Sequence, residues 1–130
     1  IIYHAAGGTG NGVFSEAIDL KIEDPDRELW VIGVDKDQYE EGNGKTKDGK
    51  DFNVTLTSMV KRVDVAVKDL SEKAKAGDFP GGEIIEYGIQ EDAIGIAPAP
   101  HDEHLSDEVK AKVKEFQDKI LSGEIEVPTK

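Results

Sequence analysis

The segment from Ile1 to Phe14 constrains the fold more than any other part of the sequence. It reads Ile-Ile-Tyr-His-Ala-Ala-Gly-Gly-Thr-Gly-Asn-Gly-Val-Phe, an apolar start followed by a glycine-rich stretch. Glycines permit a tight turn and a close approach to a ligand, and a helix N-terminus offers unpaired N–H donors. The segment therefore predicts a strand, a glycine turn and the first turn of a helix, an arrangement that binds small molecules in open α/β sheets.

Two familiar glycine signatures match this turn poorly. The dinucleotide fingerprint needs a third glycine where this sequence has Val13 or Ser15. Gly7 and Gly12 have the spacing of a phosphate loop, but apolar residues follow in place of lysine and a hydroxyl. Nucleotide-phosphate binding is therefore disfavoured. The alternative is that the glycines serve only the close packing of a strand on a helix.

Apolar runs alternate with segments of helical periodicity along the chain. Strands are predicted near residues 1–5, 29–34, 54–57 and 83–89. Helices are predicted over 13–22, from about 59 to 76, and from a cap at Ser106 to Gly123, with a polar loop at 40–51. This alternation indicates an α/β fold, a Rossmann-like parallel sheet with flanking helices. The sequence opens on an apolar segment without a polar lead-in, so we expect further chain upstream.

Charge and cysteine content exclude several classes of function. Lys and Arg total 16 against 28 Asp and Glu, a formal charge of −12. Such a chain repels phosphate backbones, so no nucleic-acid partner is expected. The absence of cysteine excludes disulfides, thiolate metal sites and a cysteine nucleophile in this segment. No apolar run approaches the roughly 20 residues that span a bilayer.

Four segments resemble one family, the basic membrane proteins, which are substrate-binding lipoproteins of bacterial ABC importers akin to purine nucleoside receptors. These segments are His4–Phe14, Trp30–Gln38, Leu56–Ala66, and Ser106–Lys110 together with Ile120–Ile125. Their order and approximate spacing follow the family through the whole chain. Residues 40–53 resemble it least.

The resemblance implies a partial type I periplasmic-binding-protein fold, in which two α/β lobes joined by three crossovers clamp the ligand. This chain would be the C-terminal portion: residues 1–57 in the second lobe, 58–82 a crossover helix segment, and 83–130 a return strand and C-terminal helix. The first lobe and a lipid-anchored N-terminus would lie upstream. The implied ligand is a nucleoside, with a purine base expected, the implied partner is an ABC permease, and the implied location is extracytoplasmic at the cell membrane. No cofactor or metal is expected.

Phe14 and Gly10 are the candidate ligand residues in the glycine turn. A phenylalanine ring just past this turn can stack on a base, a contact worth about 1–3 kcal/mol in nucleic-acid systems. Its spacing alone favours a core phenylalanine on the first helical turn. The resemblance implies the stacking role.

Asp35 and Lys61 are the candidates for the sugar. Asp35 ends an apolar run, and a carboxylate there can accept hydrogen bonds from two vicinal hydroxyls; the alternative is a turn-forming aspartate, and Asp37 is a close second. Lys61 is expected at the start of the crossover helix, donating to ribose oxygens while pairing with Asp35. A lone lysine is more often a solvated surface residue. The resemblance implies ribose binding by both residues.

Two further interpretations compete with a binding module. The segment His101-Asp102-Glu103-His104 could hold a metal ion, but Pro98 and Pro100 favour a polar loop. A Rossmann-type enzyme domain with a nucleotide cofactor is the alternative function. An enzyme needs an acid, a base or a nucleophile in a cleft, and no such set is evident, so we expect no catalysis.

An isolated portion of such a protein is expected to expose an apolar helix face. The apolar stripe of the helix near 59–76 would lose its partner if its sheet belonged to the missing lobe. We therefore expect this stripe either to pack on the sheet of the same piece or to meet a second copy, by swapping or simple dimerisation. With only half of the clamp present, we also expect nucleoside to bind very weakly. The stripe consists of Val63, Ala66, Val67 and Leu70.

Overall fold

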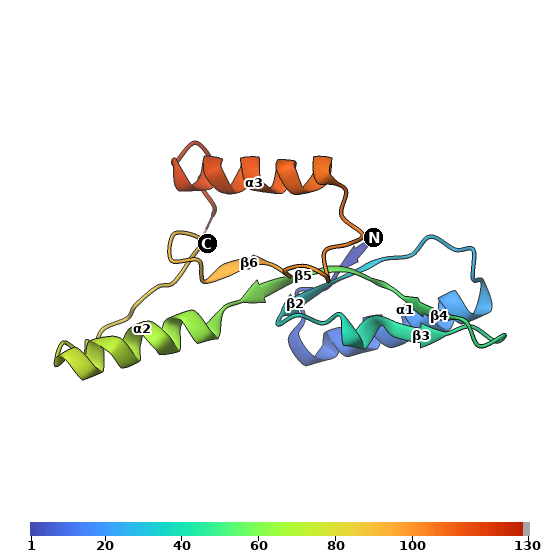
Figure 1. Cartoon of the computed structure of the whole chain (residues 1–130), viewed down its shortest axis with the longest axis horizontal. Coiled ribbons are helices and arrows are strands. Elements are labelled where there is room, and N and C mark those ends of the chain that lie inside the picture. Colours follow the sequence, from blue (N-terminus) through green and yellow to red (C-terminus); the bar gives the residue numbers. More distant parts are fainter. Residues whose placement is uncertain (129–130) are drawn as a thin grey trace. The chain divides into compact units, whose positions relative to one another are not determined.

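A computed structural model describes residues 1–128 of the 130-residue chain. The chain forms two compact units, which we describe separately (Figure 1). The first unit contains Ile1–Lys61 and Ile96–Leu105, and the second contains Arg62–Gly95 and the chain from Ser106 onward.

The first unit is built on parallel strands, as the alternating pattern predicts. Its elements are β1 (Ile2–Tyr3), η1 (Gly7–Gly10), α1 (Asn11–Glu23), β2 (Val31–Asp35) and β5 (Thr55–Lys61). Strand β2 pairs in parallel with β1 on one side and with β5 on the other. The short strand β6 (Ile94–Ile96) completes the sheet order β1-β2-β5-β6, and the N–H of Ala97 donates to the carbonyl of Ser58. The prediction of a parallel α/β fold is confirmed.

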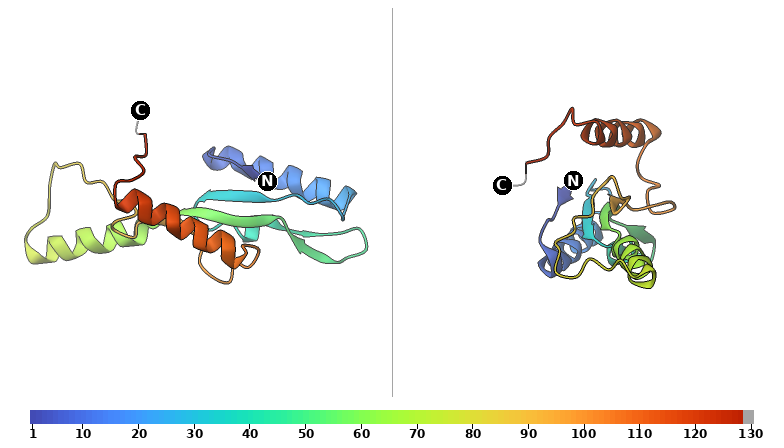
Figure 2. Two further views of the ribbon diagram at one scale, coloured as in Figure 1. Left: turned by 90° about the horizontal axis from the view of Figure 1, so that it is seen from above. Right: turned by 90° about the vertical axis from the view of Figure 1, so that its left-hand side faces the viewer.

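The core of the first unit lies between α1 and the sheet, which run alongside each other in Figure 2. Its buried side chains are Phe14, Ala17, Val31 and Val54, with Val13, Ile18, Leu29 and Phe52 packed around them. The helical spacing of the α1 residues and the buried run of β2 bring these side chains onto one interface.

Residues 40–51 differ from the predicted polar loop. They contain the short helix η2 (Glu40–Gly42) and begin an antiparallel hairpin of β3 (Asn43–Lys45) and β4 (Asp51–Asn53). The Asn53 amide group fastens this hairpin by donating to the carbonyl of Tyr39 and to the side-chain oxygen of Asn43. Side-chain amides therefore give regular structure to residues 40–51, although their polar composition is typical of a loop.

The second unit contains two amphipathic helices, α2 (Val63–Ala76) and α3 (Asp107–Leu121). Gly77 ends α2 in the left-handed conformation with φ of +79°, and its N–H bonds back to the last turn. The Ser106 hydroxyl caps α3 by accepting from the N–H of Val109, as predicted. Several apolar side chains of both helices are exposed, namely Val63, Val67, Val109, Phe116 and Leu121.

Two predicted boundaries are wrong. Residues 83–89 form no strand, and β6 lies at Ile94–Ile96 instead. Side-chain hydrogen bonds hold the earlier segment instead: the Tyr87 hydroxyl donates to the Asp69 carboxylate of α2, and the N–H of Gly88 donates to the side chain of Glu91.

The second error concerns the start of the crossover helix. Strand β5 ends only at Lys61, because its residues pair with β2 as far as Val60, and α2 begins at Val63. Between residues 1 and 128, no helix combines the length and apolarity required to cross a membrane.

Candidate functional site

The carboxyl ends of β2 and β5 bring Asp35 and Lys61 together. Asp35 is in register with Val60, so the last residues of two parallel neighbours meet at one edge of the sheet. The Lys61 Nζ lies 2.7 Å from the Asp35 Oδ1, with side chains 58% and 49% exposed. The hydrogen bond that the ammonium donates to Asp35, together with the negative charge of that carboxylate, raises the pKa of Lys61 above its usual value. The predicted pairing is confirmed, although Lys61 ends a strand and does not begin a helix.

Asp35 has an unusual backbone conformation. Its φ is +72°, in the left-handed region that side chains seldom adopt, although aspartate tolerates it better than most residues. The chain turns sharply there, and the N–H of Lys36 donates to the carbonyl of Val34 over 2.9 Å. A backbone of this kind persists only where the surrounding contacts hold it.

A buried glutamine anchors the segment that follows. We call residues 35–39 the β2 turn. The Gln38 Oε1 accepts from the N–H of Val34, and the N–H of Gln38 donates to the Ser58 Oγ, each over 2.9 Å. Gln38 and Ser58 are both buried. Gly33 makes room for them, since a Cβ there would lie 2.6 Å from the Ser58 Oγ. The β2 turn is therefore fixed to β5 at Ser58, which is in register with Gly33.

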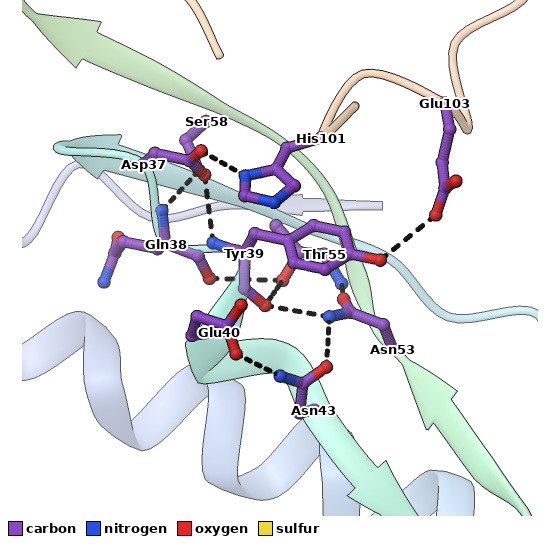
Figure 3. Close-up of polar contacts among 10 residues, drawn as sticks. All are labelled: Asp37, Gln38, Tyr39, Glu40, Asn43, Asn53, Thr55, Ser58, His101 and Glu103. Carbon is purple, nitrogen blue, oxygen red and sulfur yellow. Dashed lines mark hydrogen bonds and ion pairs between the residues drawn. The ribbon is translucent and has the colours of Figure 1, made fainter. Parts of the chain in front are cut away.

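A second group of side chains holds the β2 turn from the loop after β6 (Figure 3). The Asp37 carboxylate accepts from the N–H of Tyr39 over 3.0 Å through Oδ1 and lies 2.5 Å from the His101 Nδ1 through Oδ2. The rings of Tyr39 and His101 stack with centroids 4.0 Å apart and 3° between their planes. The Tyr39 hydroxyl donates to Glu103 over 3.1 Å, and this bond raises the pKa of Tyr39.

The glycine turn forms a separate contact group. Gly10 is buried, and a Cβ at this position would lie 2.0 Å from the Nδ1 of His4. The His4 ring meets the Phe14 ring edge-on at 5.4 Å, and the two residues are 5% and 2% exposed. Phe14 thus occupies the core position that its spacing favours. The structure groups Phe14 and Gly10 with His4, and Asp35 with Lys61. The ligand roles of Phe14 and Gly10 stay predictions.

Sequence reasoning missed Gln38, Ser58 and the stacking of Tyr39 on His101. Tyr39 and His101 are far apart along the chain, and no local spacing connects them. The one available signal was the histidine-rich loop, which we interpreted as merely polar. Within residues 1–128, no three His, Cys, Asp or Glu side chains are grouped as metal ligands would be.

The arrangement at the sheet edge suits a ligand with hydroxyl groups. An aspartate carboxylate accepts hydrogen bonds, and a lysine ammonium supplies three donors beside it. Both groups are about half exposed, so a ligand could reach them without unfolding either strand.

Comparison with known proteins identifies a family that the whole chain resembles. The model of the family described as "ABC transporter substrate-binding protein PnrA-like" matches residues 1–130. The chain is 59% identical to the CD4+ T-cell-stimulating antigen of Listeria monocytogenes, over 100% of the chain and 36% of that relative. It is 40% identical to the ABC transporter nucleoside-binding protein BmpA of Lactococcus lactis, again over 100% and 36%. Basic membrane protein A of Borreliella burgdorferi is 30% identical, over 99% and 34%. The chain spans about a third of the length of these relatives.

Proposed function

This chain belongs to the family of PnrA-like ABC transporter substrate-binding proteins, and we propose that it is the C-terminal part of a receptor that binds a nucleoside. The name of the Lactococcus relative, a nucleoside-binding protein, supports this ligand class. In the complete protein, a first lobe would close over the site from the other side. A clamp of that kind buries most of a small ligand's surface.

The Asp35–Lys61 pair is the observation that carries the proposal. In our interpretation, the Asp35 carboxylate accepts from two adjacent ribose hydroxyls while Lys61 donates to a ribose oxygen. The sequence has a net charge of −12, which disfavours ligands that carry phosphate and favours an uncharged nucleoside over a nucleotide. The family consists of binding proteins, so we propose no catalysis.

Phe14 and Gly10 complete the proposed site. The Phe14 ring is almost fully buried against His4, so stacking on a base requires a local movement of the glycine turn. Gly7, at φ of +51°, and the unhindered Gly8 are the positions where this turn can change conformation at low cost. A purine is the expected base.

Family membership also supports the proposed setting of the complete protein. We place it outside the cytoplasm at the cell membrane, held by a lipid anchor outside this segment, where it would deliver its ligand to an ABC permease. The role in import is tested by nucleoside uptake in cells with and without the receptor gene. Unchanged uptake would contradict it.

The binding role is tested by the substitution Asp35→Ala in the intact protein. We expect nucleoside affinity to fall at least tenfold, about 1.4 kcal/mol, because a charged hydrogen bond to the ligand is lost. Calorimetric titration with adenosine and inosine measures the change. The matched control is Asp26→Ala, which removes an exposed aspartate from the turn after α1 and should leave affinity unchanged. Equal affinities for Asp35→Ala and the wild type would exclude this assignment.

A further inference from the structure

The loop at residues 97–105 contacts the β2 turn through several side chains. None of them is Asp35 or Lys61, the two residues of the proposed ribose site. His101 contributes two of them, the 2.5 Å contact with the Asp37 carboxylate and the stack on Tyr39. Glu103 adds the hydrogen bond with the Tyr39 hydroxyl. These residues belong to the same unit as Asp35 and Lys61.

The Asp37 carboxylate connects this loop to the backbone of the turn. One oxygen accepts from the N–H of Tyr39, and the other lies against His101. A carboxylate bound only to the backbone N–H would be free to rotate, whereas the histidine fixes both oxygens. The Asp37 and His101 side chains are each about 30% exposed, so water screens this contact only in part.

The position of the Asp35 carboxylate depends on how firmly the β2 turn is held. The left-handed backbone of this residue is a costly conformation, of order 1–3 kcal/mol, and Asp35 begins the same five-residue segment. Gln38 secures the segment from the side of the sheet, and His101 secures it from the loop. Loosening either attachment would let the Asp35 carboxylate leave its place beside Lys61.

We propose that His101 is a positioning residue for ligand binding, which holds the β2 turn chiefly through its contact with the Asp37 carboxylate so that Asp35 stays aligned for the ribose. This inference rests on the proposed function. It assigns to the histidine-rich loop a role in affinity that involves neither a metal nor a direct ligand contact. The loop ends at Leu105, one of the points where the chain passes from one unit to the other. The position of Asp35 therefore depends on a loop that connects the two units along the chain.

Three variants of the intact protein test the inference. His101→Ala removes the donor and the stack, and we expect a five- to tenfold loss of affinity for adenosine and inosine, on the order of one charged hydrogen bond. His101→Asn keeps an N–H donor near the position of Nδ1, so affinity should recover to within about twofold of the wild type. The matched control is His104→Ala in the same loop. It removes a ring contact with Trp30 at 4.6 Å and a 3.6 Å contact with the Glu103 Oε1, but it leaves the Tyr39–Glu103 bond and the His101 contacts in place, so affinity should be unchanged.

A second measurement reports on the turn without any ligand. Amide hydrogen exchange followed by mass spectrometry on the unliganded protein covers a peptide spanning residues 34–41. We expect faster exchange there in His101→Ala, because the N–H of Tyr39 is less firmly held, and wild-type exchange in His101→Asn and His104→Ala.

The outcomes separate the inference from the proposed function. Wild-type protein that binds neither nucleoside overturns the proposed function and the positioning role with it. Wild-type affinity in His101→Ala, with or without faster exchange, overturns the positioning role alone. A loss of affinity that His101→Asn does not restore also overturns it, since the donor to Asp37 would then not be the cause.

Discussion

Gly10 shows at the scale of a single residue how tightly the glycine turn is packed. A Cβ at Gly10 would overlap the His4 ring, whereas a Cβ at Gly12 would meet no atom within 4 Å. We expect Gly10→Ala to lower the free energy of unfolding by about 1–3 kcal/mol, because the buried His4 ring must shift against Phe14. The matched control Gly12→Ala lies in α1 and should stabilise by about 0.5–1 kcal/mol. Urea denaturation measures both, and equal effects would mean that the turn adjusts freely.

Helix α3 shows how charge pairs act at the scale of an element. The Glu115 carboxylate lies 2.8 Å from Lys112 and 2.9 Å from Lys119, and these bonds lower its pKa to about 2. A lowered folded-state pKa means that the stabilisation is complete above the usual value of 4.5 and is lost as the pH falls towards 2. We expect Lys112→Ala to raise the pKa of Glu115 measured by NMR titration, and 0.5 M salt to raise it in the wild type. The control Lys68→Ala, in α2, should leave it unchanged. A pKa near 4.5 in the wild type would contradict the pairing.

At the scale of the whole molecule, residues 1–128 expose a substantial apolar surface. Val63 and Val67 on α2 are 65% and 58% exposed, and the chain spans about a third of its relatives. We expect the 130 residues alone to self-associate with rising concentration in light scattering and to bind nucleoside only very weakly, since the proposed first lobe would not cover the ligand. The double variant Val63→Ser and Val67→Ser should reduce association. A monomer that binds nucleoside with about micromolar affinity, near −8 kcal/mol, would contradict our placement of the missing lobe.

Several features of this protein follow from the sequence by itself. The buried run of β2, the helical spacing of α1 and the Ser106 cap are local patterns, and local patterns specify local structure. The meeting of Asp35 with Lys61 was also predictable, because parallel neighbours place their carboxyl ends at one edge and both residues were assigned near that edge. The family was likewise recognisable from short segments in the right order.

Tertiary structure decided the features that depend on contacts between distant residues. Strand β5 extends past residue 57 because β2 pairs with it as far as Val60, and residues 83–89 form no strand because side chains of α2 and of the local turn bind them instead. The burial of Phe14 against His4 depends on a turn that only the folded chain closes. The stack of His101 on Tyr39 joins two loops far apart in sequence, and no local pattern encodes such a contact. Short-range periodicity therefore determined the elements, and long-range packing determined which of their side chains meet at the site.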